Sequence, residues 1–228
     1  MMLVYFLNLY HPFYFALTCK QPNTNSQLII PFAIHFTFAA MQQVVDFISS
    51  YIKMSEEELH FIADNLQFTS FEKGEILLQQ GQILNKMAFI IKGAVRGYYS
   101  DESGTEHTLG FALENQPLVA FDSFTQQTPI GFTSVALENT ETIWISQSAF
   151  YNFLETYPRY EKVLRTIISE YMTIEGEKTK LLRIVSAKER YKALLETHPE
   201  LVKRVPLKYI ASYLGMTTEN LSRVRSQK

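Results

Sequence analysis

The sequence predicts an α+β fold, with an antiparallel β-roll followed by a long dimerisation helix and a small C-terminal helix-turn-helix domain. Between residues 68 and 146, β-branched and aromatic residues alternate with polar ones, and glycines recur. Beyond residue 158, apolar residues instead recur every three or four positions, as on one face of a helix. About eight alternating strands must close or pair to cover their apolar face, so we expect a roll or barrel.

These changes of pattern divide the chain into four segments. We expect an apolar extension, a β-roll domain, a dimerisation helix and a helix-turn-helix domain, in the order 1–40, 41–157, 158–184 and 185–228. Pro158 fits the first turn of the long helix, because proline needs no hydrogen-bond partner for its nitrogen there.

The apolar extension contains one charged residue, Lys20, and is broken by three prolines. Its two apolar stretches, 3–18 and 28–40, are shorter than the ~20 residues that span a bilayer, so we expect no membrane span. No basic residue precedes Lys20, as a signal peptide would require. We predict that Met41 is the biological start and that the extension is not native; the rival interpretation is an anchor in a membrane interface.

Composition excludes several classes of site. Cys19 is the only cysteine, so no disulfide framework or thiol cluster can form within the chain, and a cytoplasmic location fits. Between Met41 and His198 the only histidines are His60 and His107, too few for the histidine and carboxylate set of a metal-dependent β-barrel enzyme. We therefore expect no bound metal, no cofactor and no catalytic residues.

Charge is distributed unevenly along the chain. Residues 1–177 contain 9 Lys or Arg and 19 Asp or Glu, a net charge of −10, whereas residues 178–228 contain 12 and 4, a net charge of +8. Such a basic end suits a polyanion, because Lys and Arg neutralise nucleic-acid phosphates. The alternative is a solvated, Lys-rich surface.

Local signals mark the ends of several elements. Ser55 to Glu58 forms a capping box that predicts a helix start, and Ser186 to Glu189 forms a second one. The run 101–104, Asp-Glu-Ser-Gly, predicts a hairpin turn between two strands. The sequence 148–154 predicts a short helix after the last strand, and the His-Pro pair at 198–199 predicts the end of the helix that begins at Ser186.

The predicted long helix spans roughly 25 residues, or about 38 Å. Its apolar residues form one stripe, which we expect to be the dimer interface: Val163, Ile167, Tyr171, Ile174 and Leu181. A second copy is the simplest partner, because two-fold symmetry makes a single stripe self-complementary. The alternative is that the stripe packs on its own β-roll.

The C-terminal segment has the spacing of a helix-turn-helix. One helix would bury Leu207, Ile210, Ala211 and Leu214, and a second would bury Leu221 and Val224. Small Ala211 permits close approach of the helices, and Gly215 supplies the left-handed turn between them. The second helix, capped by Thr217, would enter the major groove of DNA.

The exposed side of this motif supplies the candidate DNA contacts. Arg223 suits guanine and Glu219 suits a cytosine amino group, although the two could instead form a surface ion pair. We assign base contacts to Thr218, Glu219, Ser222 and Arg223, and phosphate contacts to Thr217, Lys208 and Arg225.

Several runs resemble the Crp/Fnr family of regulators. They are residues 71–77, Gly81, 89–96 and 210–223, and together the resemblance covers about Met41 to Arg225. The runs 186–191 and 205–208 look like the variant found in Bacteroidetes. The resemblance implies a cyclic-nucleotide-binding-like sensor domain, a homodimer, and binding to promoter DNA, with RNA polymerase and an unidentified small-molecule effector as candidate partners.

Two departures limit what the resemblance implies. Nucleotide-binding members of the family hold the cyclic phosphate with an arginine, but no arginine occurs in 121–124 or 129–133, so we do not expect cyclic AMP to bind. The candidate effector pocket consists of Phe111, Phe121, Asp122, Ser123, Phe132 and Thr133; these aromatic residues and Phe124 could equally form core. The chain ends five residues after Arg223, so we expect no contacts from the β-wing that follows this helix in many relatives.

A second function remains open from the sequence. The chain could be a ligand-sensing subunit whose basic end binds a protein partner rather than DNA. A salt titration of binding to random duplex separates the two, because phosphate contacts weaken steeply as salt rises.

Overall fold

The computed structural model describes the backbone of residues 29–226 and the side chains of residues 39–226. The chain divides into two compact units, Met1–Phe36 and Thr37–Lys228, and the second contains all the strands that the structure describes. Predictions that fall on residues 1–28 lie outside the described residues. Helix α3 (Ile29–Ser49) runs through Met41, and the assignment of the start to this residue stays a prediction. Within the described part, each helix is too short or too polar to cross a membrane.

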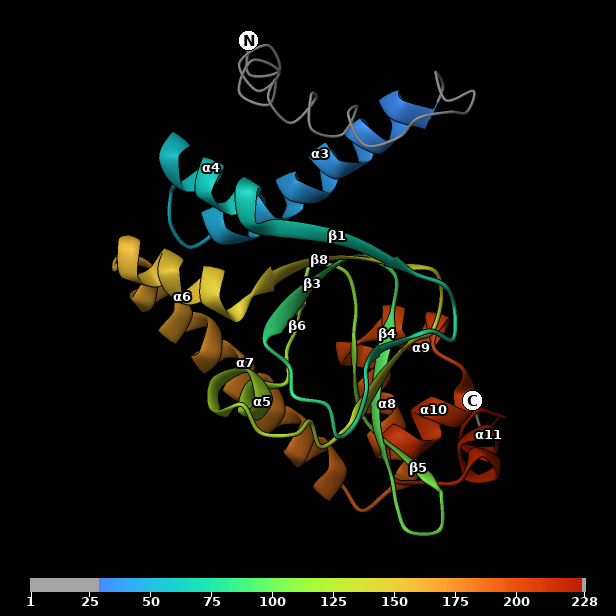
Figure 1. Cartoon of the computed structure of the whole chain (residues 1–228). Coiled ribbons are helices and arrows are strands. Elements are labelled where there is room, and N and C mark those ends of the chain that lie inside the picture. The colour runs from blue at the N-terminus through green and yellow to red at the C-terminus, as the bar shows by residue number, and fades with distance from the viewer. Residues whose placement is uncertain (1–28, 227–228) are drawn as a thin grey trace. The chain divides into compact units, whose positions relative to one another are not determined.

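Eight strands form the predicted β-roll (Figure 1). They make two four-stranded antiparallel sheets, with the orders β1-β8-β3-β6 and β2-β7-β4-β5. The strands are β1 (Leu66–Phe71), β2 (Ile76–Leu78), β3 (Lys86–Lys92), β4 (Val95–Ser100), β5 (Glu106–Ala112), β6 (Pro117–Leu118), β7 (Thr133–Ala136) and β8 (Thr140–Ser146). The roll and the approximate number of strands expected from the sequence are therefore confirmed.

Large apolar side chains fill the interior of the roll. Trp144 of β8 is 2% exposed and belongs to a cluster with Leu78, Leu84 and Ile130. The indole nitrogen of Trp144 donates a hydrogen bond to the hydroxyl of Thr142 at 2.8 Å. The single polar atom of this buried side chain therefore has a hydrogen-bond partner. Leu78 and Trp144 lie on strands, whereas Leu84 and Ile130 lie in the loops between elements. Burial along β3 and β8 is continuous over 88–91 and 142–144 and does not alternate as the sequence pattern suggested.

Helix α4 (Glu56–Asn65) begins at the predicted capping box, in which Ser55 and Glu58 exchange both expected hydrogen bonds. Glu58 has a further role, because its buried carboxylate accepts from Arg159 Nε at 2.9 Å and from the Tyr160 hydroxyl at 3.0 Å. Burial opposes ionisation of Glu58, but these hydrogen bonds together hold its pKa below the usual value. The start of the long helix is thereby tied to α4.

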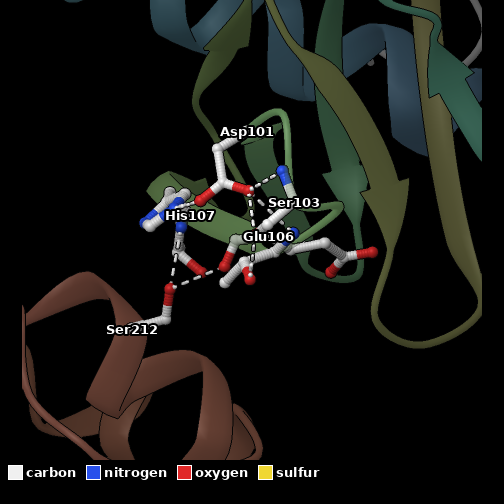
Figure 2. Close-up of polar contacts among 7 residues, drawn as sticks. Asp101, Ser103, Glu106, His107 and Ser212 are labelled. Atoms are coloured by element: carbon white, nitrogen blue, oxygen red, sulfur yellow. Dashed lines mark hydrogen bonds and ion pairs between the residues drawn. The ribbon is translucent and has the colours of Figure 1, made fainter.

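The turn between β4 and β5 is the predicted hairpin. The carboxylate of Asp101 accepts hydrogen bonds from the hydroxyl and backbone nitrogen of Ser103 and from the backbone nitrogen of Thr105. Its other oxygen lies 2.7 Å from Nε2 of His107 (Figure 2). The Ser103 hydroxyl is the largest cause that lowers the pKa of Asp101. This side chain therefore closes the turn and fixes the start of β5.

The remaining helices follow the roll or interrupt it. They are α5 (Phe121–Gln126), α6 (Gln147–Thr156), α7 (Tyr160–Arg183), α8 (Ala187–Thr197), α9 (Pro199–Arg204), α10 (Leu207–Tyr213) and α11 (Thr218–Ser226). The long helix and the short helix before it match the expectation. The sequence did not predict α5 or α9. Pro199 ends α8, as expected, but it also occupies the first turn of α9.

Gly93, between β3 and β4, occupies a position that no other residue fits. Its φ is +107°, and an added Cβ would lie 2.5 Å from Thr140 Oγ1 and 2.7 Å from Thr140 Cα. We expect Gly93→Ala to lower the free energy of unfolding by about 2–4 kcal/mol, from backbone strain together with overpacking. Gly131→Ala is the control, because an added Cβ there meets nothing within 4 Å; its change should stay within about 0.5 kcal/mol. Urea unfolding measures both, and equal losses would contradict the assignment.

Candidate nucleic-acid interface

Helices α10 and α11 form the predicted helix-turn-helix. Ile210 and Ala211 of the first helix and Leu214, which caps its C-terminus, pack in one cluster with Leu221 of the second helix, and each is at most 1% exposed. Gly215 has a φ of +64° and so supplies the left-handed residue that the turn needs. The small core holds α11 against α10 and leaves the polar side of α11 at the surface.

Most of the predicted DNA contacts lie on that surface. Thr218 is half-buried, and the other six are exposed: Thr217, Glu219, Ser222, Arg223, Arg225 and Lys208. In the part of the chain whose side chains are described, Glu219 and Arg223 do not form the ion pair that the sequence left open as an alternative. Both charged groups are therefore available to a ligand.

Thr217 caps helix α11. Its hydroxyl oxygen accepts a hydrogen bond from the backbone nitrogen of Asn220 at 3.2 Å, as a residue at this position should. The capping expected from the sequence is confirmed, while the phosphate contact assigned to Thr217 stays a prediction. The hydroxyl proton of Thr217 is not used in this cap, so it can be donated to a phosphate oxygen.

Lys208 lies in the first turn of α10. Its ammonium group is 4.7 Å from the centre of the Tyr209 ring, and the side chain is exposed. In a helix-turn-helix the first helix crosses the DNA backbone, so a cation in this turn suits a phosphate.

The opposite side of α10 packs against the free edge of β5. The backbone nitrogen of Thr108 donates to Ser212 Oγ at 2.9 Å, and that hydroxyl donates to the carbonyl oxygen of Glu106 at 3.4 Å. Figure 2 shows Ser212 facing these strand residues. Next to Ser212, the ring of Tyr213 lies edge-on to Phe111 of β5, and burial raises the pKa of Tyr213 to about 12. Helix α10 is therefore covered on two sides.

A buried arginine extends this contact. Arg96 of β4 is 2% exposed, and its guanidinium carbon lies 4.0 Å from the centre of the Tyr209 ring and 4.4 Å from that of Tyr98. Its nitrogens donate to Thr108 Oγ1 at 2.9 Å and to Glu106 at 2.5 Å. The charge is thus paired and stacked between two aromatic faces, an arrangement suited to a planar guanidinium.

Arg204, at the end of α9, makes an ionic contact between the helical domain and the roll. Its two terminal nitrogens donate to the two carboxylate oxygens of Glu114, each at 2.7 Å, and it also contacts Glu138. Hydrogen bonding by this guanidinium lowers the pKa of Glu114 to about 2. We call the set of Arg96, Glu114, Arg204, Tyr209 and Ser212 the interdomain junction.

Sequence reasoning missed the interdomain junction. Its members carry no common motif, and the partners of Arg204 lie 90 and 66 positions away in the chain. The available signal was the excess of basic residues at the C-terminal end, which we attributed to a polyanion, a solvated surface or a protein partner, and not to the acidic roll of the same chain.

The predicted dimer stripe on α7 is covered at its ends and open in its middle. Val163 packs near the base of α7 with a cluster around Tyr160, and Leu181 packs against the core of the helical domain. Ile174 is 59% exposed and Tyr171 is 37% exposed. Ile167, between them and the base, is half-buried. The ends of the stripe are thus packed within the chain, and a dimer interface at its exposed middle stays a prediction.

The predicted effector residues lie on β5, on α5, on β7 and in the loop before β7. Ser123 and Thr133 are buried, and their hydroxyls accept hydrogen bonds from the backbone nitrogens of Leu84 and Gln80. Phe132 packs against the cluster inside the roll. Asp122 on α5 is exposed.

Two predicted effector residues touch helices instead. The ring of Phe121, on α5, lies 5.3 Å from that of Tyr171 on α7. Phe111 lies against Tyr213 and so belongs to the surface between the roll and α10. Phe124, which could equally have lined the pocket, is 2% exposed and contacts Phe150 of α6. An effector role for the set stays a prediction.

The chain is similar to a known domain family and to known regulatory proteins. A family model described as the cyclic nucleotide-binding domain matches residues 68–157. The chain is 25% identical over 213 residues to the Anaerobic regulatory protein of Haemophilus influenzae, covering 87% of this chain and 74% of that relative. It is 27% identical over 184 residues to Regulatory protein HlyX of Actinobacillus pleuropneumoniae, covering 75% of each.

Solved structures share the fold. FixK2 from Bradyrhizobium japonicum superposes with a TM-score of 0.60 at 19% identity, over 71% of this chain and 83% of its own. The c-di-GMP responsive global regulator CLP from Xanthomonas campestris superposes with a TM-score of 0.60 at 15% identity, over 76% and 91%. The match to the Bacteroidetes variant stays a prediction.

Loss of the Thr217 cap should destabilise the C-terminal domain. We expect Thr217→Ala to lower the free energy of unfolding by about 1 kcal/mol, because the backbone nitrogen of Asn220 loses its acceptor. Thr217→Ser keeps the hydroxyl and should lie within about 0.5 kcal/mol of the parent. Urea unfolding measures both variants, and an alanine variant as stable as the serine variant would show that the cap contributes nothing.

Proposed function

Because the chain belongs to the Crp/Fnr family of transcriptional regulators, we propose that it binds duplex DNA as a homodimer and places α11 in the major groove. One observation carries the proposal. Helix α11 buries Leu221 in the core of the domain while its polar side chains, including Glu219 and Arg223, face solvent without pairing to each other.

The chemistry of α11 suits the edges of bases. Arg223 can donate two parallel hydrogen bonds to O6 and N7 of guanine, and Glu219 can accept from the amino group of cytosine. Thr218 and Ser222 face the same groove. Thr217, Lys208 and Arg225 would hold the phosphates on either side and so set the position of the helix along the duplex.

The exposed middle of α7 supports the homodimer. An apolar side chain as exposed as that of Ile174 gains free energy when a second copy covers it, and parallel pairing of two α7 helices would bring Ile174 and Tyr171 of both chains together. A dimer also presents two copies of α11, which suits operators that contain two half-sites.

A ligand bound in the roll would affect this interface through helix α5. Phe121 on α5 contacts Tyr171 on α7, so a ligand that moves α5 would alter the packing of the dimer helix. We propose that such a ligand shifts the population between two dimer geometries. Its identity is open, and we do not expect cyclic AMP, because Phe121 to Phe124 and Pro129 to Thr133 contain no arginine for the cyclic phosphate.

A transcription regulator acts where the DNA is, so we propose a cytoplasmic location and RNA polymerase as a further partner. The relatives are regulatory proteins, and we propose no catalytic role. The second candidate, a sensing subunit whose basic end binds a protein, predicts little affinity for duplex at any salt concentration. Selection from a random DNA pool tests the choice, because a palindromic motif requires both a dimer and base contacts.

Removal of Arg223 should weaken specific binding. We expect Arg223→Ala to lose about 1–3 kcal/mol of discrimination, which is roughly ten- to hundredfold in affinity, and to relax the preference at one base pair of the selected motif. Lys73→Ala removes the same charge from the β-roll domain and should bind like the parent. Fluorescence anisotropy on the selected motif measures both variants, and parent-like binding by Arg223→Ala would contradict the assignment.

A charge in the middle of α7 should break the dimer. Ile174→Glu would bury two unpaired carboxylates in a two-fold interface, so we expect the dimer dissociation constant to rise by about a hundredfold or more. Ser169→Glu adds the same charge on the opposite side of the exposed helix and should leave the dimer intact. Sedimentation equilibrium measures the dissociation constants, and a dimeric Ile174→Glu would place the interface elsewhere.

A further inference from the structure

We propose that Arg204 is a positioning residue that fixes the orientation of the helix-turn-helix on its own β-roll and thereby sets the half-site spacing that the dimer accepts. This inference rests on the proposed DNA-binding function. Arg204 is not one of the predicted DNA contacts; it acts through the interdomain junction.

Arg204 binds two carboxylates of the roll at the same time. Its guanidinium meets Glu114 with two parallel hydrogen bonds of 2.7 Å, a bidentate arrangement that fixes direction as well as distance. Glu138 contacts the same group from a second loop of the roll. Glu114 is itself held, because it accepts a hydrogen bond from the backbone nitrogen of Gly93 at 2.9 Å. One side chain therefore joins α9 to two loops at the same time.

A second contact holds α10 at a different place. Ser212 bonds the free edge of β5 at Thr108 and Glu106 (Figure 2). Beside it, Tyr209 stacks on the buried guanidinium of Arg96. A single ionic contact would act as a pivot. Two contacts on successive helices, α9 and α10, prevent rotation of the helical domain about either one.

The docked arrangement leaves the proposed DNA surface open. All five members of the interdomain junction lie on the roll, on α9 or on α10, and none lies on α11. Glu219, Ser222 and Arg223 stay exposed while the junction is formed. The junction therefore does not block DNA binding by covering these side chains, and its role in the proposal is to orient α11.

The junction affects the accepted half-site spacing only in the dimer. The roll and α7 set the distance between the two copies, and the junction sets the angle of each helix-turn-helix on its roll. Two recognition helices match half-sites one helical turn apart, about 34–36 Å, only when both quantities are fixed. A loosened junction should let each copy bind its half-site at several spacings, with the base preference unchanged.

The test uses the full chain and duplexes that carry two copies of the selected half-site at varied spacing. The measured quantity is the ratio of affinities between the best spacing and spacings one and two base pairs away. We expect Arg204→Gln to reduce that ratio about fivefold or more, while its affinity for a duplex with a single half-site equals that of the parent. Lys203→Gln removes the same charge from α9, where Lys203 pairs with Glu200 of the same helix, and should keep the parental ratio.

A variant on the other side of the contact excludes a direct role of Arg204 in DNA binding. Glu114→Gln leaves the charge of the helical domain unchanged and should reduce the spacing ratio in the same way. Hydrogen exchange at the Thr108 amide, which donates to Ser212, reports undocking without DNA and should accelerate in both variants.

Three results would overturn the inference. One is a parental spacing ratio in Arg204→Gln; another is a weaker single half-site affinity in Arg204→Gln with no effect of Glu114→Gln, which would make Arg204 a phosphate contact. The third is tighter binding at all spacings in both variants, which would make the junction inhibitory. Failure of the proposed function looks different, because the parent itself would then bind no duplex with any preference.

Discussion

The free edge of strand β5 constrains the arrangement of the whole second unit. An edge strand exposes unpaired backbone groups, and proteins cover or disrupt such edges. Here Ser212 of α10 takes both a donor and an acceptor from that edge, and Arg96 is buried beneath Tyr209 beside it. The helix that covers the edge is also the first helix of the helix-turn-helix. The same contact therefore covers the sheet edge and positions the helix-turn-helix.

The uneven charge of the chain has two consequences in the structure. Exposed cations such as Lys208, Arg223 and Arg225 suit phosphates, as the sequence suggested. Arg204 is instead used within the molecule, where two carboxylates of the acidic roll bind it. A net charge summed over a segment cannot separate these uses, because it contains no information on which groups meet.

Local patterns predicted most of the elements, for reasons that the structure makes clear. Three of these patterns depend only on residues a few positions apart: the capping box at Ser55, the turn at Asp101 and the left-handed residue at Gly215. Their sequence spacing is therefore enough to predict their local geometry. Helices α5 and α9 escaped prediction because each is only six residues long, too short to show a helical period. The capping role of Glu58 was visible in the sequence, but its bond to Arg159, 101 positions away, was not.

By itself, the sequence determined the fold class, the order of the parts and the polar surface of α11, because each follows from periodicity and from short-range backbone chemistry. Only the tertiary structure decided which helix covers β5, which carboxylates bind Arg204, and how much of the stripe on α7 stays open at Ile174. These contacts join residues that are 66 to 106 positions apart or concern a surface that no pattern marks. Their formation depends on the packing of the whole unit, which fixes distance and direction together, and a single sequence carries no local trace of either.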